Sequence, residues 1–480
     1  MALKQEKQKA CASGFFCGRH KSPHKFGYAI NLLVNSPSRR GELVKLESFP
    51  ASWLLNMSRL ILTLPLLIAF ETSLAGAPYL IETRAQPAGI AANTFLGYAL
   101  AAGDRGVGLA GALNGTVQVI APNPGGNIVF AQTLSSGINA DLFGASVAVA
   151  SPQVLGSFAA VGAFGDDVPS LNSGKVYAYR TQASLLMPFA EAGVLSPPIP
   201  SATGNFGYSV AAEGNFIYVG EVKAQNPGGD VVGAVHVFEN TGATTWALRT
   251  SIYGTQLDGV QGRRFGHAVA VSGNTLAIGA PKENEGAFTT AGAVYVYTGA
   301  GASWTQQARL TAGDLGSDDE LGSAVDIDGD TIVAGGSRDD KVVGNDAGSA
   351  YIFARNAGTW SQSAKLLSSG ATTGNLFGTA VSISGNEALV GAYCEPNGAN
   401  ACTGPGSVEA FQRGVNGNWI AVQRIVAADG VNGEGFGSSV AHAGPTNRFA
   451  YVGAFRASTP ALAGAVYLLR GDQLFADGFE

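Results

Sequence analysis

Residues 265–281 have the sequence FGHAVAVSGNTLAIGAP. The stretch begins with Phe-Gly, ends with Gly-Ala-Pro, and contains two short apolar runs on either side of Ser-Gly-Asn-Thr. A Gly-Asn pair between alternating apolar runs is typical of a two-residue β-hairpin turn. The stretch therefore predicts two short antiparallel strands, and nothing in it suggests a catalyst.

Divergent copies of this stretch follow one another along the chain. A Phe-Gly or Leu-Gly anchor recurs at intervals of 47 to 63 residues, and its glycines are Gly97, Gly144, Gly207, Gly266, Gly322, Gly378 and Gly437. In four copies a second glycine follows 13 positions later, and these are Gly220, Gly279, Gly335 and Gly391. The corresponding Gly162 and Gly453 come later because the intervening turn is longer. A fixed repeat of this kind indicates a repeat architecture.

Each copy continues with two further strand patterns. The third is a glycine followed by an alternating run, as in GAVYVY from residue 292. Four copies then have a tryptophan that opens a fourth run, at Trp246, Trp304, Trp360 and Trp419. Seven copies of four antiparallel strands predict an all-β fold, a seven-bladed β-propeller. A linear solenoid is the alternative, but it needs atypical capping repeats at both ends.

The two ends of the repeat region favour a closed ring. The seventh copy ends after GAVYLL at Leu469 and lacks a fourth strand. Residues 78–89, before the first anchor, resemble an isolated fourth strand. Pairing residues 79–84 with 464–469 would complete the last blade and remove both free sheet edges, which are an aggregation hazard.

Composition agrees with short strands and excludes one class of partner. The 480 residues include 67 glycines, and only 13% are charged. Residues 1–56 carry 9 Lys/Arg and 3 Asp/Glu, so the net charge of −6 leaves −12 on the remainder. An acidic remainder without a basic stripe predicts no nucleic-acid partner.

The N-terminal region resembles an export signal. Residues 57–77 contain a short basic start, an apolar run too short to span a bilayer, and Ala-Gly-Ala ending at Ala77, which fits a cleavage site. We therefore predict four parts: an upstream segment at 1–56 from a misassigned start, a signal peptide at 57–77, the propeller at 78–470 and a tail at 471–480. The mature chain is predicted to be secreted, periplasmic or at the cell surface, monomeric, and without a membrane span.

The exported part contains two cysteines, Cys394 and Cys402, which bracket the loop CEPNGANAC. Export to an oxidising compartment predicts a disulfide between them. A metal site would need two further ligands, which the neighbouring sequence does not offer.

The anchors and the Gly-Ala pairs together resemble the FG-GAP repeat of the integrin α-chain propeller, in the variant found in exported bacterial proteins. The resemblance covers nearly all of residues 79–469. It implies a calcium loop of the form Asp-x-Asp/Asn-x-Asp-Gly-x-x-Asp between the first and second strands, but here most of these connections have only two residues. Only Asp326, Asp328 and Asp330 resemble the start of such a loop, and the closing acid is missing. The alternative is a plain hairpin turn.

A larger set of acids is expected at the opposite ends of the strands. Two loops of the fifth blade, 313–320 and 338–346, share one rim because both follow even-numbered strands. They contain Asp314, Asp318, Asp319, Glu320, Asp339, Asp340 and Asp346. These acids predict a cation site, with calcium possible, or a patch for a basic partner. The alternative is a solvated rim that only aids solubility.

Catalytic signals are weak. The three histidines of the mature chain, His236, His267 and His442, occupy ordinary strand positions, and no nucleophile–base spacing accompanies them. Arg470-Gly471-Asp472 matches an integrin-ligand tripeptide by chance, and the ending LFADGFE resembles a C-terminal tag of exported Gram-negative proteins.

These patterns predict an exported, non-enzymatic binding or adhesion module that recognises an extracellular protein or glycan. The expected ligand face is the rim of longer loops, at 164–173, 221–232, 281–291, 337–347, 393–405 and 455–463. The alternative is a polysaccharide-acting propeller enzyme, a glycosidase or lyase, because a glycosidase needs only a suitably placed carboxylate pair.

Overall fold

The computed structural model describes residues 79–471, apart from 104–105, 124, 138–140, 151–156, 169, 182–188, 256–263, 341–345, 395–403, 444–448 and 458–460. These residues belong to one compact unit, Leu74–Glu480. The predicted upstream segment, signal peptide, cleavage site at Ala77 and LFADGFE tail lie outside the described residues.

The described residues form seven four-stranded antiparallel sheets, as predicted. Six sheets use consecutive strands: β2 (Ala99–Ala102), β3 (Gly108–Ala112), β4 (Thr116–Pro122) and β5 (Ile128–Ser135); β6 (Ser146–Val149), β7 (Phe158–Ala163), β8 (Lys175–Thr181) and β9 (Phe189–Leu195); β10 (Phe206–Glu213), β11 (Phe216–Glu221), β12 (Ala234–Asn240) and β13 (Trp246–Tyr253); β14 (Ala268–Ser272), β15 (Thr275–Ala280), β16 (Ala293–Ala300) and β17 (Ser303–Leu310); β18 (Leu321–Asp328), β19 (Thr331–Gly336), β20 (Ser349–Asn356) and β21 (Thr359–Leu366); β22 (Ala380–Ser384), β23 (Glu387–Ala392), β24 (Ser407–Arg413) and β25 (Trp419–Ile425). The seventh joins β26 (Phe436–His442), β27 (Phe449–Ala454) and β28 (Ala465–Gly471) to β1 (Tyr79–Ala85).

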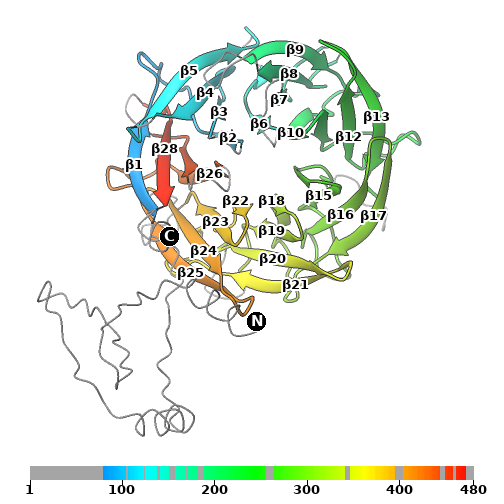
Figure 1. Cartoon of the computed structure of the whole chain (residues 1–480). Coiled ribbons are helices and arrows are strands. Elements are labelled where there is room, and N and C mark those ends of the chain that lie inside the picture. Colours follow the sequence, from blue (N-terminus) through cyan, green and yellow to red (C-terminus); the bar gives the residue numbers. More distant parts are fainter. Residues whose placement is uncertain are drawn as a thin grey trace, which may run out of the picture. The chain divides into compact units, whose positions relative to one another are not determined.

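The seven sheets are blades around a central opening (Figure 1). The first strand of each blade lies at the opening, and the fourth strand lies on the outside (Figure 1). Each of the seven hydrophobic clusters in the described part contains residues from two neighbouring blades. A single blade therefore has no core of its own, and burial depends on its neighbours in the ring.

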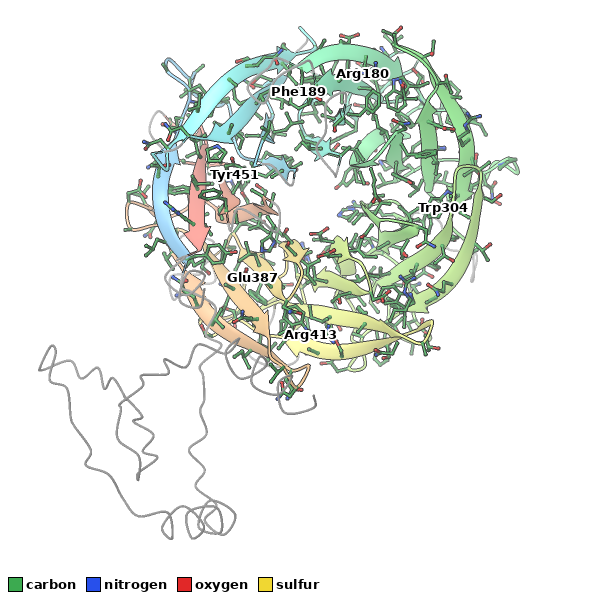
Figure 2. The ribbon with its side chains drawn as sticks, viewed as in Figure 1. Arg180, Phe189, Trp304, Glu387, Arg413 and Tyr451 are labelled. Atoms are coloured by element: carbon green, nitrogen blue, oxygen red, sulfur yellow. The ribbon has the colours of Figure 1, made fainter. Side chains whose placement is uncertain are left out.

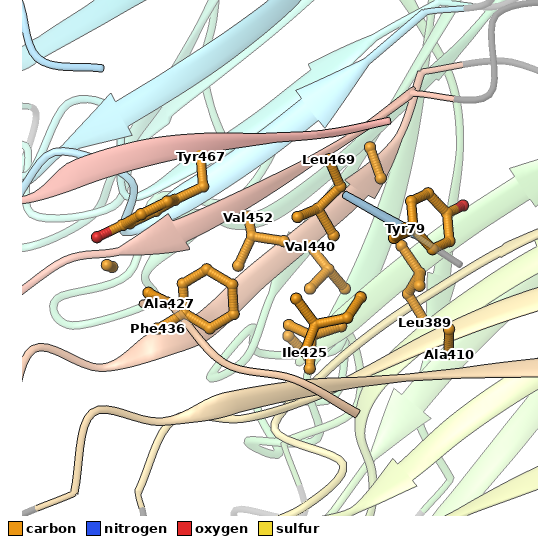
Figure 3. Close-up of a cluster of buried hydrophobic side chains, with 14 of the residues drawn as sticks. Tyr79, Leu389, Ala410, Ile425, Ala427, Phe436, Val440, Val452, Tyr467 and Leu469 are labelled. Carbon is orange, nitrogen blue, oxygen red and sulfur yellow. The ribbon is translucent and has the colours of Figure 1, made fainter. Parts of the chain in front are cut away.

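The ring closes where the sequence predicts. β1 pairs antiparallel with β28, with Ile81 opposite Leu469 and Ala85 opposite Val466. Tyr79 is buried with Leu469 of its own blade and Leu389 of the sixth blade (Figure 3). The N-terminal strand is thus anchored both to the last blade and to the blade before it.

The tryptophans that open fourth strands also join blades. Trp304 at the start of β17 lies on the outer part of the ring (Figure 2) and contacts Tyr218 of the preceding blade edge to face, with 5.8 Å between ring centroids. Trp246 contacts Phe158 of its preceding blade in the same way, at 4.9 Å. These outer contacts supplement the cores between the blades.

The repeated glycines mark the closest approach between blades. A Cβ atom on the Gly-Ala glycine of any blade would lie closer than 3.0 Å to the carbonyl oxygen of the next blade's anchor glycine. The seven pairs are Gly111–Gly144, Gly162–Gly207, Gly220–Gly266, Gly279–Gly322, Gly335–Gly378, Gly391–Gly437 and Gly453–Gly97. The anchor glycines also have φ between 83° and 94°, which disfavours other residues. The Gly-Ala glycine of one blade and the anchor glycine of the next thus allow the backbones of neighbouring blades to come into contact.

Replacing one of these glycines should loosen a blade junction. We expect Gly279→Ala to lower the free energy of unfolding by about 1–3 kcal/mol, because its methyl group meets backbone that cannot move aside. Gly313→Ala is the matched control, since its Cβ would make an ordinary contact at 3.5 Å. Urea denaturation of both variants measures the difference, and equal stabilities would contradict the role assigned to the pair.

Candidate functional site: the loop face

The two ends of the propeller differ in their connections. The connections from first to second strands and from third to fourth strands lie at one end, which we call the hairpin face. The loops from second to third strands and from each blade to the next meet at the other end, which we call the loop face. The longer rim loops expected from the sequence lie there, wherever their residues are described.

Exposed large apolar side chains are concentrated on the loop face. Of the thirteen in the described residues, seven lie there: Tyr98, Val168, Leu171, Ile199, Phe288, Val431 and Leu462. Five lie on outer strands, and one, Val415, lies on the hairpin face. More than half of the exposed large apolar side chains of the described residues thus lie on the loop face.

Aromatic side chains gather where the first strands begin and the second strands end. Phe455 contacts Phe95, Tyr98 and Tyr393, with centroid distances of 6.4, 5.8 and 6.0 Å. A second group joins Phe164 to Tyr208 at 5.1 Å and Tyr208 to His267 at 4.9 Å. We call these residues the aromatic collar: Phe95, Tyr98, Phe164, Tyr208, His267, Tyr393 and Phe455.

The collar tyrosines influence one another's ionisation. Burial raises the pKa of Tyr98, and Tyr393 raises it further. Burial also raises the pKa of Tyr208, and Tyr98 is its next largest influence.

The predicted acidic rim contains one group of converging carboxylates. Asp319, Asp339 and Asp340 each bring an oxygen within 4.8 Å of the others, and no other described residues form such a group. Asp319 and Asp339 are both only 2% exposed, so the interpretation as a solvated rim is wrong for these two. Calcium takes six to eight oxygens, of which these residues could supply three.

The other predicted rim acids are held by separate partners. Glu320 forms ion pairs with Lys282 and Arg338. Asp318 accepts a hydrogen bond from the hydroxyl of Thr290. Asp346 accepts the backbone N–H of Leu376 through its carbonyl. The structure therefore places these acids on one face but does not bring them to one point.

Asp314 and Asp339 belong to a clasp between the fourth and fifth blades. Lys365 of β21 lies 2.5 Å from Asp314 and 2.6 Å from Asp339. Tyr351 of β20, which pairs with Lys365, donates to Asp314 at 3.0 Å. Burial opposes the charge of Lys365, but its hydrogen bonds to the two carboxylates outweigh this and raise its pKa. Asp314 comes from the loop that leaves the fourth blade, so the clasp links two blades.

A calcium titration tests the acidic group. If Asp319, Asp339 and Asp340 hold the ion, millimolar calcium should raise the melting temperature of the wild type by mass action. The shift should disappear in Asp319→Asn/Asp340→Asn, while the matched change Asp330→Asn should leave it intact. An equal shift in all three proteins, or none in the wild type, would rule out this site.

The predicted calcium-loop acids point in different directions. Asp326 accepts the backbone N–H groups of Ile327 and Ile383 at 2.9 and 2.8 Å. Asp328 accepts the N–H of Gly385, at the hairpin of the next blade, at 2.6 Å. Asp330 pairs with Arg355 at 2.6 Å. Two of the three carboxylates thus cap amides of the sixth blade, and the third holds its own blade together.

The central channel is lined by the first strands of all seven blades and has a volume of about 420 Å³. Its lining is mostly Ala, Val, Leu and Ile. Ser382 interrupts it between two titratable neighbours, with a hydrogen bond to Asp326 on one side and to His442 Nδ1, at 3.0 Å, on the other. Ser382 also accepts the backbone N–H of His442 at 3.1 Å. Polar channel residues therefore cap exposed amides of the innermost strands.

Comparison with known families agrees with this architecture. Residues 255–297, 304–353, 360–408 and 419–469 match the FG-GAP repeat family. Each matched segment contains an anchor glycine and its Gly-Ala glycine, which form the contacts between blades. The matched repeats and the ring of seven blades fit an FG-GAP repeat propeller. No curated protein matches it significantly. No described helix of this propeller is long and apolar enough to cross a membrane.

His236 of the FG-GAP propeller has hydrogen-bond partners that the sequence did not reveal. His236 Nδ1 lies 2.8 Å from Ser251 Oγ, and Nε2 lies 2.9 Å from Glu221. The prediction that no nucleophile–base spacing accompanies the histidines is therefore wrong for His236. His236 and Glu221 are each 1% exposed.

The neighbouring blade explains this chain of hydrogen bonds. His236 pairs with Ser251 across β12 and β13, as Tyr295 pairs with Arg309 across β16 and β17. Tyr295 donates to Glu283 at 3.0 Å, just as His236 contacts Glu221. His236, Ser251 and Glu221 thus occupy in the third blade the place that Tyr295, Arg309 and Glu283 occupy in the fourth. They pack within the blade.

Two further sequence features lie only partly within the described residues. Cys394 is buried at 4% exposure, and its predicted partner Cys402 lies outside the described residues, so the disulfide stays a prediction. Arg470 and Gly471 belong to β28 and pair with β1, while Asp472 lies outside. The first two residues of the tripeptide are thus part of a sheet.

Two channel groups have pKa values displaced in opposite directions. Burial lowers the pKa of His442 to about 4. Burial raises the pKa of Asp326 to about 6, although its hydrogen bonds from Ile383, Ile327 and Ser382 oppose the rise. Between pH 6 and 4, Asp326 is therefore protonated in the folded state but ionised in the unfolded state. His442 shows the opposite difference, because it is neutral in the folded state and protonated in the unfolded state.

The pH dependence of stability should separate these groups. As pH falls from 6.5 to 4, His442 costs stability, because only the unfolded histidine is protonated, whereas Asp326 adds stability. We expect His442→Gln to lose less stability over this range than the wild type, and Asp326→Asn to lose more. Each difference should be about 1–2 kcal/mol, since channel solvent reduces the full effect. Denaturation at several pH values measures it, and parallel profiles would contradict the displaced pKa values.

Proposed function

We propose that this FG-GAP propeller is an exported, non-enzymatic binding module that recognises an extracellular protein or glycan through its loop face. A propeller with FG-GAP repeats is in general a binding module. The proposal adds the compartment, the face and the class of ligand.

The distribution of exposed apolar residues carries the proposal. Seven of them lie on the loop face, against one on the hairpin face of the described chain. Val168 and Leu171 are 60% and 59% exposed in a single loop of the second blade, and Phe288 is 42% exposed in the fourth. Covering such groups with a partner is favourable, so their greater number on the loop face supports a ligand there.

The start of the first strand supports export. β1 begins at Tyr79, two residues after the predicted cleavage site at Ala77. Cleavage there would leave every residue of the strand that closes the ring. The mature protein would therefore have a complete propeller.

The state of the acids supports binding without chemistry. A glycosidase requires two carboxylates placed on either side of a substrate bond. On the loop face Asp339, Glu320 and Glu283 are engaged by Lys365, Lys282 and Arg309, respectively. Carboxylates neutralised in this way are poor acids and bases. A polysaccharide-acting enzyme remains the alternative function.

A binding screen with matched variants tests the proposal. The mature chain should bind a component of an extracellular protein or glycan array and release no product from it. Leu171→Ser/Phe288→Ser should weaken this binding at least tenfold, since each removes exposed apolar contact area. Val415→Ser, on the hairpin face and 93% exposed, is the control and should bind as the wild type does.

Three results would overturn the proposal. Release of shortened sugar products would establish the alternative enzyme. Equal binding by the loop-face variant and the wild type would place the ligand elsewhere. Loss of binding in Val415→Ser would show that the hairpin face contributes.

A further inference from the structure

We propose that the aromatic collar binds an acidic polysaccharide, one whose sugar rings carry carboxylates. This inference rests on the proposed function and names the chemical class of its ligand. It follows from two features: ring faces of the collar that solvent reaches, and neighbouring arginines that have no acidic partner among the described residues.

The collar offers surfaces that suit sugar rings. Tyr98 is 39% exposed, and Phe455, Tyr393, Phe164 and Tyr208 are partly exposed. A pyranose ring has apolar C–H faces that pack on aromatic rings, while its hydroxyls need hydrogen-bond partners at the edges. The hydroxyls of Tyr98, Tyr208 and Tyr393 are suited to that second role.

One exposed arginine lies beside each of the two aromatic groups of the collar. Arg456 lies over the Phe455 ring, with its guanidinium carbon 4.9 Å from the centroid. Burial lowers the pKa of His267, and the charge of Arg264, three residues earlier in the chain, lowers it further. The same charge opposes the rise that burial causes in the pKa of Tyr208. One cation thus lies beside each group of aromatic rings.

These arginines differ from three other cations of the loop face. Lys365, Arg309 and Lys282 each pair with a carboxylate. Among the residues that the structure describes, neither Arg456 nor Arg264 has a carboxylate within 4.0 Å. Glu320, whose charge reaches Tyr208, is already neutralised by Lys282 and Arg338.

An unpaired arginine beside an aromatic ring favours an anionic ligand. The planar guanidinium binds a carboxylate through two parallel hydrogen bonds. A neutral glycan would leave both arginines without a counter-charge, and a cationic ligand would be repelled by them. A polymer with a carboxylate on its sugar rings matches the aromatic faces and the two cations together.

Binding of polygalacturonate oligosaccharides in calcium-free buffer tests this inference, with the carboxyl-reduced oligosaccharide as the matched ligand. We expect the mature chain to bind the acidic form at least tenfold more tightly. Arg456→Gln and Arg264→Gln should each weaken that binding roughly tenfold to a hundredfold, because each removes a charge-assisted hydrogen bond. The preference should also decline as salt concentration rises.

A control variant and a folding measurement keep the result interpretable. Arg249 pairs with Glu239 on the outer strands, so Arg249→Gln should bind the acidic oligosaccharide as the wild type does. Thermal melting of each variant shows whether it folds. Tyr98→Ala should weaken binding of the acidic and the reduced forms alike, since it removes a ring surface.

The inference fails if the reduced oligosaccharide binds as tightly as the acidic one, or if the two collar arginine variants bind like the wild type. Detection of a protein or neutral glycan ligand that depends on Leu171 and Phe288, with no binding of the acidic polymer, would also overturn it. That last result would leave the proposed function intact, whereas a ligand indifferent to Leu171, Phe288 and the collar residues alike would overturn the proposed function itself.

Discussion

The propeller depends on the contact between two glycines at each blade junction. A carbonyl of one blade occupies the space where the preceding blade would otherwise have a Cβ atom, as between Gly322 and Gly279. This approach brings two sheets so close that their apolar faces form one shared core. Seven such junctions leave no blade with an uncovered face only if the ring closes, and Gly453 meets Gly97 at the closing junction. The position of β1 is therefore a requirement of the repeat.

Polar clasps accompany these apolar junctions. In the fourth, fifth and seventh blades a tyrosine of the third strand pairs with a cation of the fourth, as Tyr467 does with Arg84. Arg84 lies 3.2 Å from Asp429, which the preceding blade's exit loop supplies. Asp314 reaches Lys365 in the same way from the exit loop of the fourth blade. The clasps of the fifth and seventh blades thus join neighbouring blades, and His236 shows that the chemistry can change while the position stays.

Much of the fold could be predicted because its determinants are local. The hairpin at Gly273 and the anchor at Gly266 are visible in one short stretch, and repetition supplies the rest. The sequence predicted which face would bind a ligand, but not which residues on that face lie together. Tyr98 and Tyr393 lie far apart in the sequence, yet both contact Phe455. The available signal was an aromatic residue directly after an anchor glycine, as at Tyr98, or directly after a Gly-Ala pair, as at Tyr393 and Phe455. Burial of Asp319 and Asp339 depends on how loops pack, which no local pattern specifies.

The difference between the two faces follows from strand geometry. Two-residue turns match the twist of their strands, so the hairpin face has little freedom to acquire new side chains. The loop face joins second to third strands and blade to blade, and its loops can vary without disturbing the glycine contacts. A ligand on the collar would touch the first, sixth and seventh blades at once, through Tyr98, Tyr393 and Phe455. Because β1 completes the seventh blade, such a ligand would bind the closed ring in preference to the open one. Recognition and closure would then stabilise each other by mass action.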